Sequence, residues 1–161
     1  MKKKSKSKND KFYPVSKPFL TKKDTQAVLR AVNSGWVSSS GKEILKFEDE
    51  FGRLLGVKYS TTVSNGTAAL EIALKSLNIK KGDQVIIPNF TIISNALAVI
   101  KLGAIPIYVD CELDSWNMNI SEMEEKITNK TKAVIATHIY NYPLDMKKIK
   151  AICKKKNKQG S

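Results

Sequence analysis

The sequence is poor in cysteine and histidine, with two cysteines and one histidine in 161 residues. Cys111 and Cys153 form no CxxC pair, so the sequence predicts neither a disulfide scaffold nor a zinc site. A secretory signal is missing, since the charged first residues contain no apolar segment. Polar residues and prolines interrupt the most apolar stretch, residues 85–109, so no membrane span is predicted. These absences favour a cytoplasmic protein.

Positive charge gathers at the two ends of the chain. Residues 1–11 carry +5 and residues 147–161 carry +7 of a net charge of +13, which leaves +1 for the middle. We therefore expect a flexible Lys-rich arm over residues 1–11, a globular part over residues 12–153 and a basic tail over residues 154–161. Because the globular part is nearly neutral, the composition argues against a nucleic-acid-binding fold.

The globular part alternates between helical and strand patterns. With 42% apolar residues, the sequence can bury a core. Apolar periodicity predicts helices after Thr21, over residues 44–55, after Thr67, and over residues 92–101, 121–127 and 144–153. Thr21 and Asp24 form a capping-box pattern at the start of the first helix, and Gly56 is expected to end the second. It predicts strands over residues 57–63, 84–87, 105–109 and 133–137. Mainly apolar strands separated by helices are typical of an α/β fold with a mostly parallel sheet and covering helices.

One strand end carries a candidate phosphate site. Ligands bind to open parallel sheets at the carboxyl ends of strands, and the first predicted strand runs through Asn65, Gly66 and Thr67 into a helix. The free backbone N–H groups and the dipole of a helix start favour an anion, and Gly66 has no Cβ to hinder its approach. The same residues also fit a simple capped helix, with Ser64 or Asn65 as the cap. No GxGxxG or GxxxxGK[ST] motif supports a Rossmann site or a P-loop.

Other candidate residues have two interpretations each. His138 and Asp110 stand at strand ends, where each is either a structural hydrogen-bonding residue or part of a site. Trp36 and Trp116 lie in loops, where each either packs on the core or contacts the ring of a ligand. The serines at 38–40 predict a flexible linker.

Five segments of the chain resemble a known protein family in their sequences and in their order along the chain. They are residues 35–41, 47–51, 64–74, 80–110 and 130–146. Together they resemble the sugar aminotransferases of the DegT/DnrJ/EryC1/StrS family, which are pyridoxal phosphate (PLP) enzymes with the aspartate aminotransferase-like fold (fold type I). The resemblance runs from Tyr13 to Cys153 and implies the N-terminal part of the large domain of such an enzyme.

Two short stretches point to a subgroup of that family. Gly-Trp-Val-Ser-Ser at 35–39 and Asp-Ser-Trp-Asn-Met at 114–118 look most like the perosamine synthetases, which aminate a GDP-linked 4-keto-6-deoxy sugar at C4. The resemblance therefore implies a nucleotide-sugar substrate, and it implies glutamate as the amino donor.

The resemblance also implies roles for candidates near the cofactor. Asn65, Gly66 and Thr67 are expected to hold the cofactor phosphate. Ile92 stands where family members usually have an aromatic residue that stacks on the pyridine ring. It would cover the ring face without the stacking interaction.

Trp36, Ser38 and His138 are implied to contact the substrate. Because the loop at Trp36 often belongs to the active site of the partner subunit in the family, we expect a homodimer or a pairing with a full-length paralogue. Asn141 replaces the usual glycine after His-Ile-Tyr, and asparagine tolerates the positive φ of such a turn.

Two catalytic groups of the family have no counterpart in these 161 residues. They are the Schiff-base lysine and the aspartate that pairs with the pyridine nitrogen, so no residue is assigned a catalytic role and the chain alone is expected to be inactive. Three alternatives stay open. The whole protein is a sugar dehydratase of the same family, in which histidine replaces the lysine; the chain is a non-catalytic partner of a full-length paralogue; or its Lys-rich ends bind a polyanion.

Overall fold

The computed structural model describes residue 12, residue 14 and residues 16–159. The chain divides into two compact units, Met1–Thr61 and Thr62–Ser161, and each has its own architecture. The Lys-rich arm expected over residues 1–11 lies outside the described residues. Within the described part of the chain, no helix is both long enough and apolar enough to cross a membrane.

In its described residues, the first unit holds two helices, α1 (Lys22–Asn33) and α2 (Lys42–Leu55). α1 begins at the predicted capping box. The Asp24 carboxylate accepts a hydrogen bond from the Thr21 N–H (2.6 Å), and the Thr21 hydroxyl accepts one from the Asp24 N–H (3.4 Å). α2 ends at Gly56, whose φ of 66° lies in the left-handed region. The start of α1 and the end of α2 therefore lie where the sequence predicts them.

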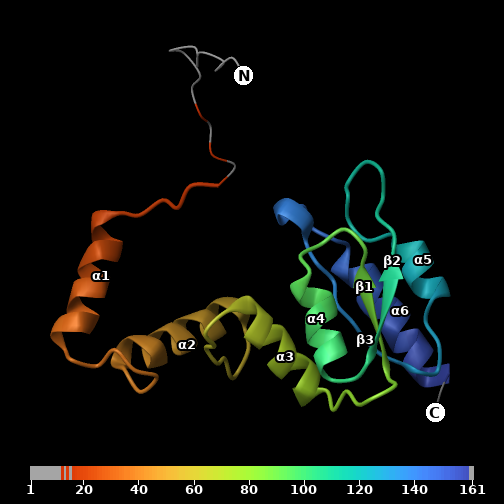
Figure 1. The fold of residues 1–161 in the computed structure, drawn as a ribbon, viewed down its shortest axis with the longest axis horizontal. Coiled ribbons are helices and arrows are strands. Elements are labelled where there is room, and N and C mark those ends of the chain that lie inside the picture. Colours follow the sequence, from red (N-terminus) through yellow and green to blue (C-terminus); the bar gives the residue numbers. More distant parts are fainter. Residues whose placement is uncertain (1–11, 13, 15, 160–161) are drawn as a thin grey trace, which may run out of the picture. The chain divides into compact units, whose positions relative to one another are not determined.

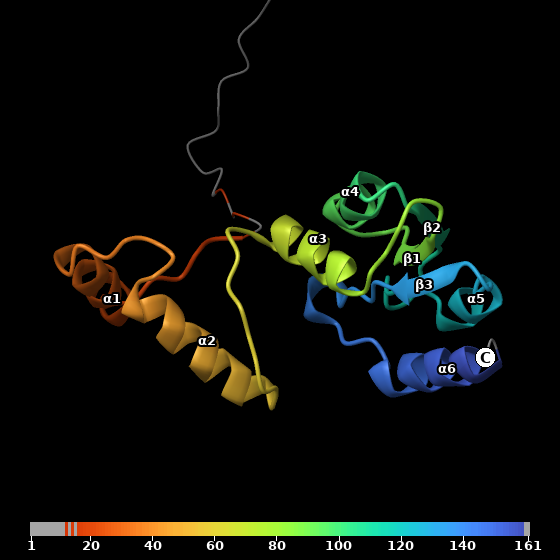
Figure 2. The ribbon, with the colours of Figure 1, turned by 90° about the horizontal axis from the view of Figure 1, so that it is seen from below.

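The second unit is built around a three-stranded parallel sheet (Figure 1). Its strands are β1 (Gln84–Pro88), β2 (Ile105–Val109) and β3 (Thr131–Val134), in the order β2-β1-β3. Helices α3 (Gly66–Ser76) and α4 (Ser94–Lys101) lie on one side of the sheet, and α5 (Ile120–Glu125) and α6 (Met146–Gln159) lie on the other (Figure 2). A short 3-10 turn, Ile139–Asn141, precedes α6. The predicted α/β fold class is confirmed.

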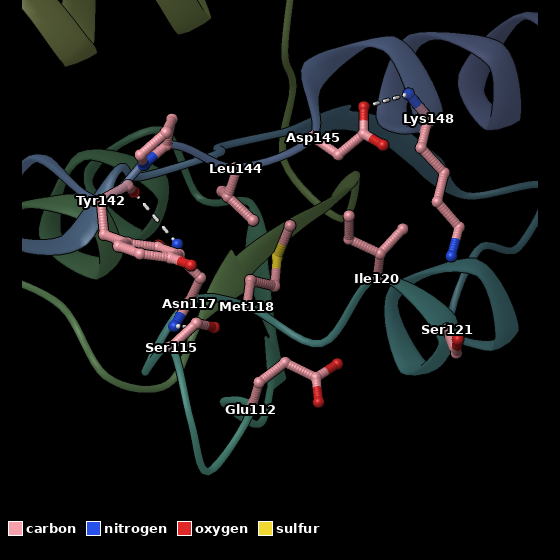
Figure 3. A pocket seen from close by; sticks show the side chains of 11 residues that line it. Glu112, Ser115, Asn117, Met118, Ile120, Ser121, Tyr142, Leu144, Asp145 and Lys148 are labelled. Atoms are coloured by element: carbon pink, nitrogen blue, oxygen red, sulfur yellow. Dashed lines mark hydrogen bonds between the residues drawn. The ribbon is translucent and has the colours of Figure 1, made fainter.

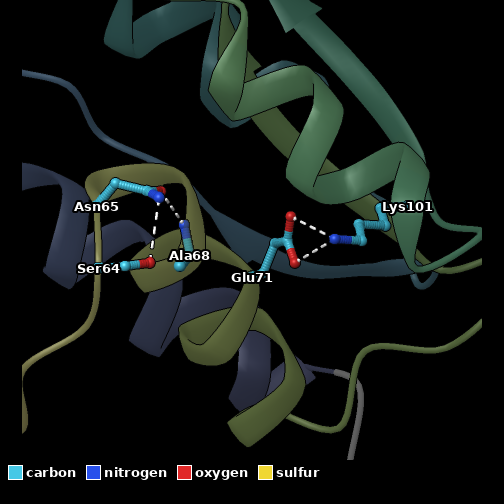
Figure 4. A network of polar contacts seen from close by, with 5 residues as sticks. All are labelled: Ser64, Asn65, Ala68, Glu71 and Lys101. Carbon is cyan, nitrogen blue, oxygen red and sulfur yellow. Dashed lines mark hydrogen bonds and ion pairs between the residues drawn. The ribbon is translucent and has the colours of Figure 1, made fainter. Parts of the chain in front are cut away.

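β1 forms the centre of the core. Its Val85, Ile86 and Ile87 are fully buried, as expected for the middle strand of a covered parallel sheet. Successive side chains of a strand point to opposite faces. Val85 and Ile87 accordingly pack with residues of α3 and α4, whereas Ile86 packs with residues of α5 and α6. The ammonium of Lys101 also joins α4 to α3, because it donates to both carboxylate oxygens of Glu71 at 2.9 and 2.8 Å (Figure 4).

Two predicted strands differ from the structure. The strand predicted over residues 57–63 is wrong, since this segment joins no ladder in the described chain. β-branched residues favour a strand only where a neighbouring strand pairs with them. The strand predicted over residues 133–137 is displaced to Thr131–Val134, because the ladder to β1 shifts register after Gln84 and ends at the Ile86–Val134 pair.

The last helix also differs from its prediction. It covers residues 146–159 instead of 144–153, so the first part of the predicted basic tail is helical. Ile149 and Ile152 are buried against the core. Lysine is a good helix former, and a helix that packs through one apolar face can continue through exposed lysines on the other.

The Glu122 carboxylate fastens α5 to the sheet. It accepts a hydrogen bond from the Asp110 N–H (2.9 Å) and pairs with Lys126, whose ammonium also donates to the Tyr108 carbonyl (2.6 Å). The hydrogen bond from Lys126, followed by that from the Asp110 N–H, holds the pKa of Glu122 below its usual value. This stabilisation is therefore complete above the usual carboxyl pKa and is lost as the pH falls through the lowered pKa.

We expect Glu122→Gln to lower the free energy of unfolding at pH 7 by about 1 kcal/mol. The difference from the parent protein should shrink below the lowered pKa, where both side chains are uncharged. Urea unfolding at several pH values measures this difference. Glu125→Gln is the control, because Glu125 is exposed on the same helix and has no ion pair among the described residues. A Glu122→Gln penalty that stays constant into acid would contradict the assignment.

Candidate functional site

The first turn of α3 is a helix start that can bind an anion. Asn65 is its cap, since the Asn65 side chain accepts a hydrogen bond from the Ala68 N–H at 2.9 Å (Figure 4). Among the described residues, nothing accepts a hydrogen bond from the backbone N–H groups of Gly66 and Thr67. Two donors at the positive end of the helix dipole are therefore available to a ligand.

Gly66 leaves the space in front of this helix start open. A Cβ added at this position would meet no atom within 4 Å. Gly66 is also the first residue of a regular helix, so packing inside the chain does not require glycine there. The open space and the two N–H donors fit a phosphate group, and a larger side chain at this position would occupy that space.

A hollow of about 400 Å³ lies at the carboxyl ends of β1 and β3. It is lined by Phe90, Thr91, Ile92, Thr137, His138, Ile139 and Tyr140. The structure thus brings Ile92 and His138, which are distant in the sequence, to one hollow. Ile92 is 66% exposed, so its side chain is available to cover the flat face of a ligand.

In the ring of His138, one nitrogen makes a structural hydrogen bond and the other is available. Its Nδ1 accepts a hydrogen bond from the Leu144 N–H at 3.0 Å, which places the proton of the neutral ring on Nε2. No described residue pairs with Nε2. A left-handed turn follows, in which Tyr140 has a φ of 46° and Asn141 a φ of 66°. Asn141 therefore adopts the positive φ expected of a residue that replaces the family's usual glycine.

Asn117 holds this turn in place, and no sequence pattern marks it as a residue that supports the site. Its Nδ2 donates to the Tyr142 carbonyl at 3.0 Å, and its Oδ1 accepts from the Ile139 N–H at 3.1 Å. It is 4% exposed and belongs to the wall of a second hollow of about 180 Å³ (Figure 3). Neither a motif nor a periodic spacing in the sequence identifies a buried asparagine in a loop. Asn95, buried against two residues that line the larger hollow, lacks such a signal as well.

Asp110 and Trp116 have structural contacts. The Asp110 carboxylate accepts a hydrogen bond from the Cys111 N–H at 2.8 Å, as in a turn at a strand end. The Trp116 ring packs against Phe90 with 5.3 Å between the ring centroids. In the part of the chain that the structure describes, no cluster of His, Cys, Asp and Glu side chains is placed to hold a metal ion.

Trp36 and Ser38 lie in the first unit, in the loop between α1 and α2. Gly41 closes this loop: its N–H donates to the Ser38 carbonyl at 3.1 Å, and a Cβ on it would stand 3.0 Å from the Trp36 carbonyl oxygen. The Trp36 side chain is exposed. Trp36 and Ser38 thus belong to the first unit, whereas Ile92 and His138 belong to the second. Their contact with a substrate stays a prediction.

Known proteins are similar to this chain in sequence and in fold. A model of the DegT/DnrJ/EryC1/StrS aminotransferase family matches residues 18–158. The GDP-perosamine synthase of Escherichia coli O157:H7 is 46% identical over 147 residues, which are 91% of this chain and 40% of that protein. A solved structure from Streptococcus pneumoniae in its PLP form, named as a sugar aminotransferase, superposes with a TM-score of 0.83 at 28% identity. The superposition covers 89% of this chain and 36% of the Streptococcus pneumoniae chain.

A GDP-4-keto-6-deoxymannose-3-dehydratase also superposes, with a TM-score of 0.80. The superposition covers 88% of this chain and 38% of the dehydratase chain. At 23% identity, this likeness shows the fold alone. The chain spans about 40% of the length of the curated relative that it matches.

Two substitutions distinguish the cap candidates at the start of α3. We expect Asn65→Ala to lower the free energy of unfolding by about 1 kcal/mol, because the Ala68 N–H loses its partner. Ser64→Ala should change it little, since among the described residues Ser64 Oγ accepts a hydrogen bond from the Asn65 side chain and none from the backbone of α3. Urea unfolding of both variants measures the difference, and equal penalties would contradict the assignment of Asn65 as the cap.

Proposed function

Because the chain belongs to the DegT/DnrJ/EryC1/StrS aminotransferase family, we propose that it is the N-terminal part of a PLP-dependent aminotransferase for a nucleotide sugar. The reaction moves an amino group from glutamate to C4 of a GDP-linked 4-keto-6-deoxy sugar. The observation that carries this proposal is the 46% identity with a GDP-perosamine synthase over 91% of the chain.

The start of α3 is the binding site for the cofactor phosphate in this proposal. The N–H groups of Gly66 and Thr67 donate to phosphate oxygens, while Asn65 keeps the first turn in place through its bond to Ala68. Ile92 covers one face of the pyridine ring from the wall of the hollow. When bound, PLP supplies an electron sink for bond changes at the amino-bearing carbon.

Substrate contacts are proposed for His138, Trp36 and Ser38. His138 is part of the lining of the hollow and has its Nε2–H available, which suits it to donate to an oxygen of the sugar. Trp36 and Ser38 contact the substrate from the loop of the first unit. They do so across a homodimer or across a pair with a full-length paralogue.

The two catalytic groups of the family come from outside these 161 residues in this proposal. They are the Schiff-base lysine and the aspartate that pairs with the pyridine nitrogen, and the chain has no counterpart of either. The chain itself supplies the phosphate end of the site and one face for the ring. It therefore binds cofactor without catalysing amino transfer unless those groups are added.

The activity is tested with the intact protein that contains this chain. We expect it to convert a GDP-linked 4-keto-6-deoxyhexose and glutamate to the 4-amino sugar nucleotide and 2-oxoglutarate. Mass spectrometry of the sugar nucleotide identifies the product. A sugar that has lost its C3 hydroxyl would identify a dehydratase instead, and the absence of both products would contradict the proposal.

Gly66→Val tests the phosphate site independently of turnover. The valine side chain fills the space in front of α3, so we expect the affinity for pyridoxamine phosphate (PMP) to fall by about tenfold or more. The fold should persist, because a Cβ at this position meets no atom. Ala69→Val adds the same side chain at an exposed position of α3 and is the control. A Gly66→Val protein that binds PMP as tightly as the parent would rule out this phosphate site.

A further inference from the structure

Asn95 connects the two walls of the larger hollow. It is the second residue of α4 and is 3% exposed. Its Nδ2 donates to the Thr91 hydroxyl at 3.0 Å and to the Thr137 hydroxyl at 2.9 Å. The Thr91 hydroxyl in turn donates to the Thr137 hydroxyl at 3.4 Å. One buried amide nitrogen thus joins the loop after β1 to the segment after β3.

Backbone hydrogen bonds do not hold these two segments together. The ladder between β1 and β3 ends at the Ile86–Val134 pair, and the Ile135 N–H makes one more bond to the Ile86 carbonyl at 2.8 Å. Further along, the described chain has no backbone hydrogen bond between residues 88–92 and residues 136–140. The separation of the two segments therefore depends on side-chain contacts.

The residues that Asn95 joins are next to those proposed to meet the cofactor ring and the substrate. Thr91 precedes Ile92, and Thr137 precedes His138, and all four line the hollow. A change in the bonds of Asn95 would therefore shift both walls. A buried polar group whose partners are removed costs more than the bonds themselves contribute, so these contacts resist opening.

The start of α4 also reaches the phosphate site. The Thr67 hydroxyl, in the first turn of α3, donates to the hydroxyl of Ser94 at 2.9 Å. Ser94 and Asn95 are consecutive residues. Through them, α4 connects the start of α3 with both walls of the hollow.

We propose that Asn95 is a positioning residue for the cofactor ring, which fixes the separation of Ile92 and His138 across the hollow. This inference rests on the proposed function, since the hollow is where that function places the ring. Phosphate alone is held by the amides of α3 and does not need the hollow. Loss of the Asn95 hydrogen bonds therefore weakens binding of a ligand that has both ring and phosphate, and it spares binding of phosphate alone.

The test compares PMP with inorganic phosphate as ligands of the intact protein. PMP has no aldehyde, so it does not react with the lysines of this basic chain. Asn95→Leu keeps the size of the side chain and removes the donor. We expect it to weaken PMP binding by about tenfold and to leave phosphate binding unchanged, as measured by titration calorimetry. Val99→Ala, at a fully buried position of the same helix, should lower stability without changing either affinity.

Substitutions of Thr137 give a second test that does not depend on whether Asn95→Leu folds. Valine keeps the shape of threonine and removes the hydroxyl that accepts from Asn95, whereas serine keeps that hydroxyl. We expect Thr137→Val to lose PMP affinity by a similar factor and Thr137→Ser to bind PMP like the parent.

The outcomes separate this inference from the proposed function. Tight PMP binding by the parent that is unchanged in Asn95→Leu and Thr137→Val would overturn the inference alone. Equal losses of PMP and phosphate affinity would also overturn it, since they report general damage to the site. A parent protein that binds neither ligand would contradict the proposed function, and the inference with it.

Discussion

The burial of β1 between two layers of helices is the constraint on which the second unit depends. β1 pairs in parallel with β2 on one side and β3 on the other, so the carboxyl ends of all three strands lie at one edge of the sheet. The loops that follow them must gather there. This is why Asn95 and Thr137, 42 positions apart in the chain, meet in a hydrogen bond.

The same arrangement explains why the proposed site has two parts of different character. Its phosphate end consists of backbone N–H groups at the start of α3, which Asn65 caps. Its ring end consists of side chains from two separate loops. The cap of the phosphate end is a hydrogen bond within one helix turn, whereas the ring end depends on contacts between two separate loops.

The sequence predicted the features that arise from short-range interactions. The capping box at Thr21, the stop at Gly56 and the turn at Asn65 each involve residues within four positions, and all three are present. The strand predicted over residues 57–63 failed because a strand also needs a partner, and β propensity does not supply one. The end of β3 was misplaced for a related reason, since register is a property of two strands.

The candidate site was predictable to the same extent. Gly66 and Thr67 stand in a local motif, and the family resemblance pointed to the same residues. Asn95 and Asn117 carry no such signal, because their importance comes from partners that only the folded chain brings near. Buried polar residues of this kind are found from hydrogen bonds, not from spacing.

We propose above all that the start of α3 binds the phosphate of the cofactor. Amide NMR of the protein during titration with PMP tests this claim most directly, because it observes the N–H groups of Gly66 and Thr67 themselves. We expect both resonances to move in a saturable manner, and we expect inorganic phosphate to move them in the same direction. Saturable binding of PMP that leaves both resonances unmoved would contradict it.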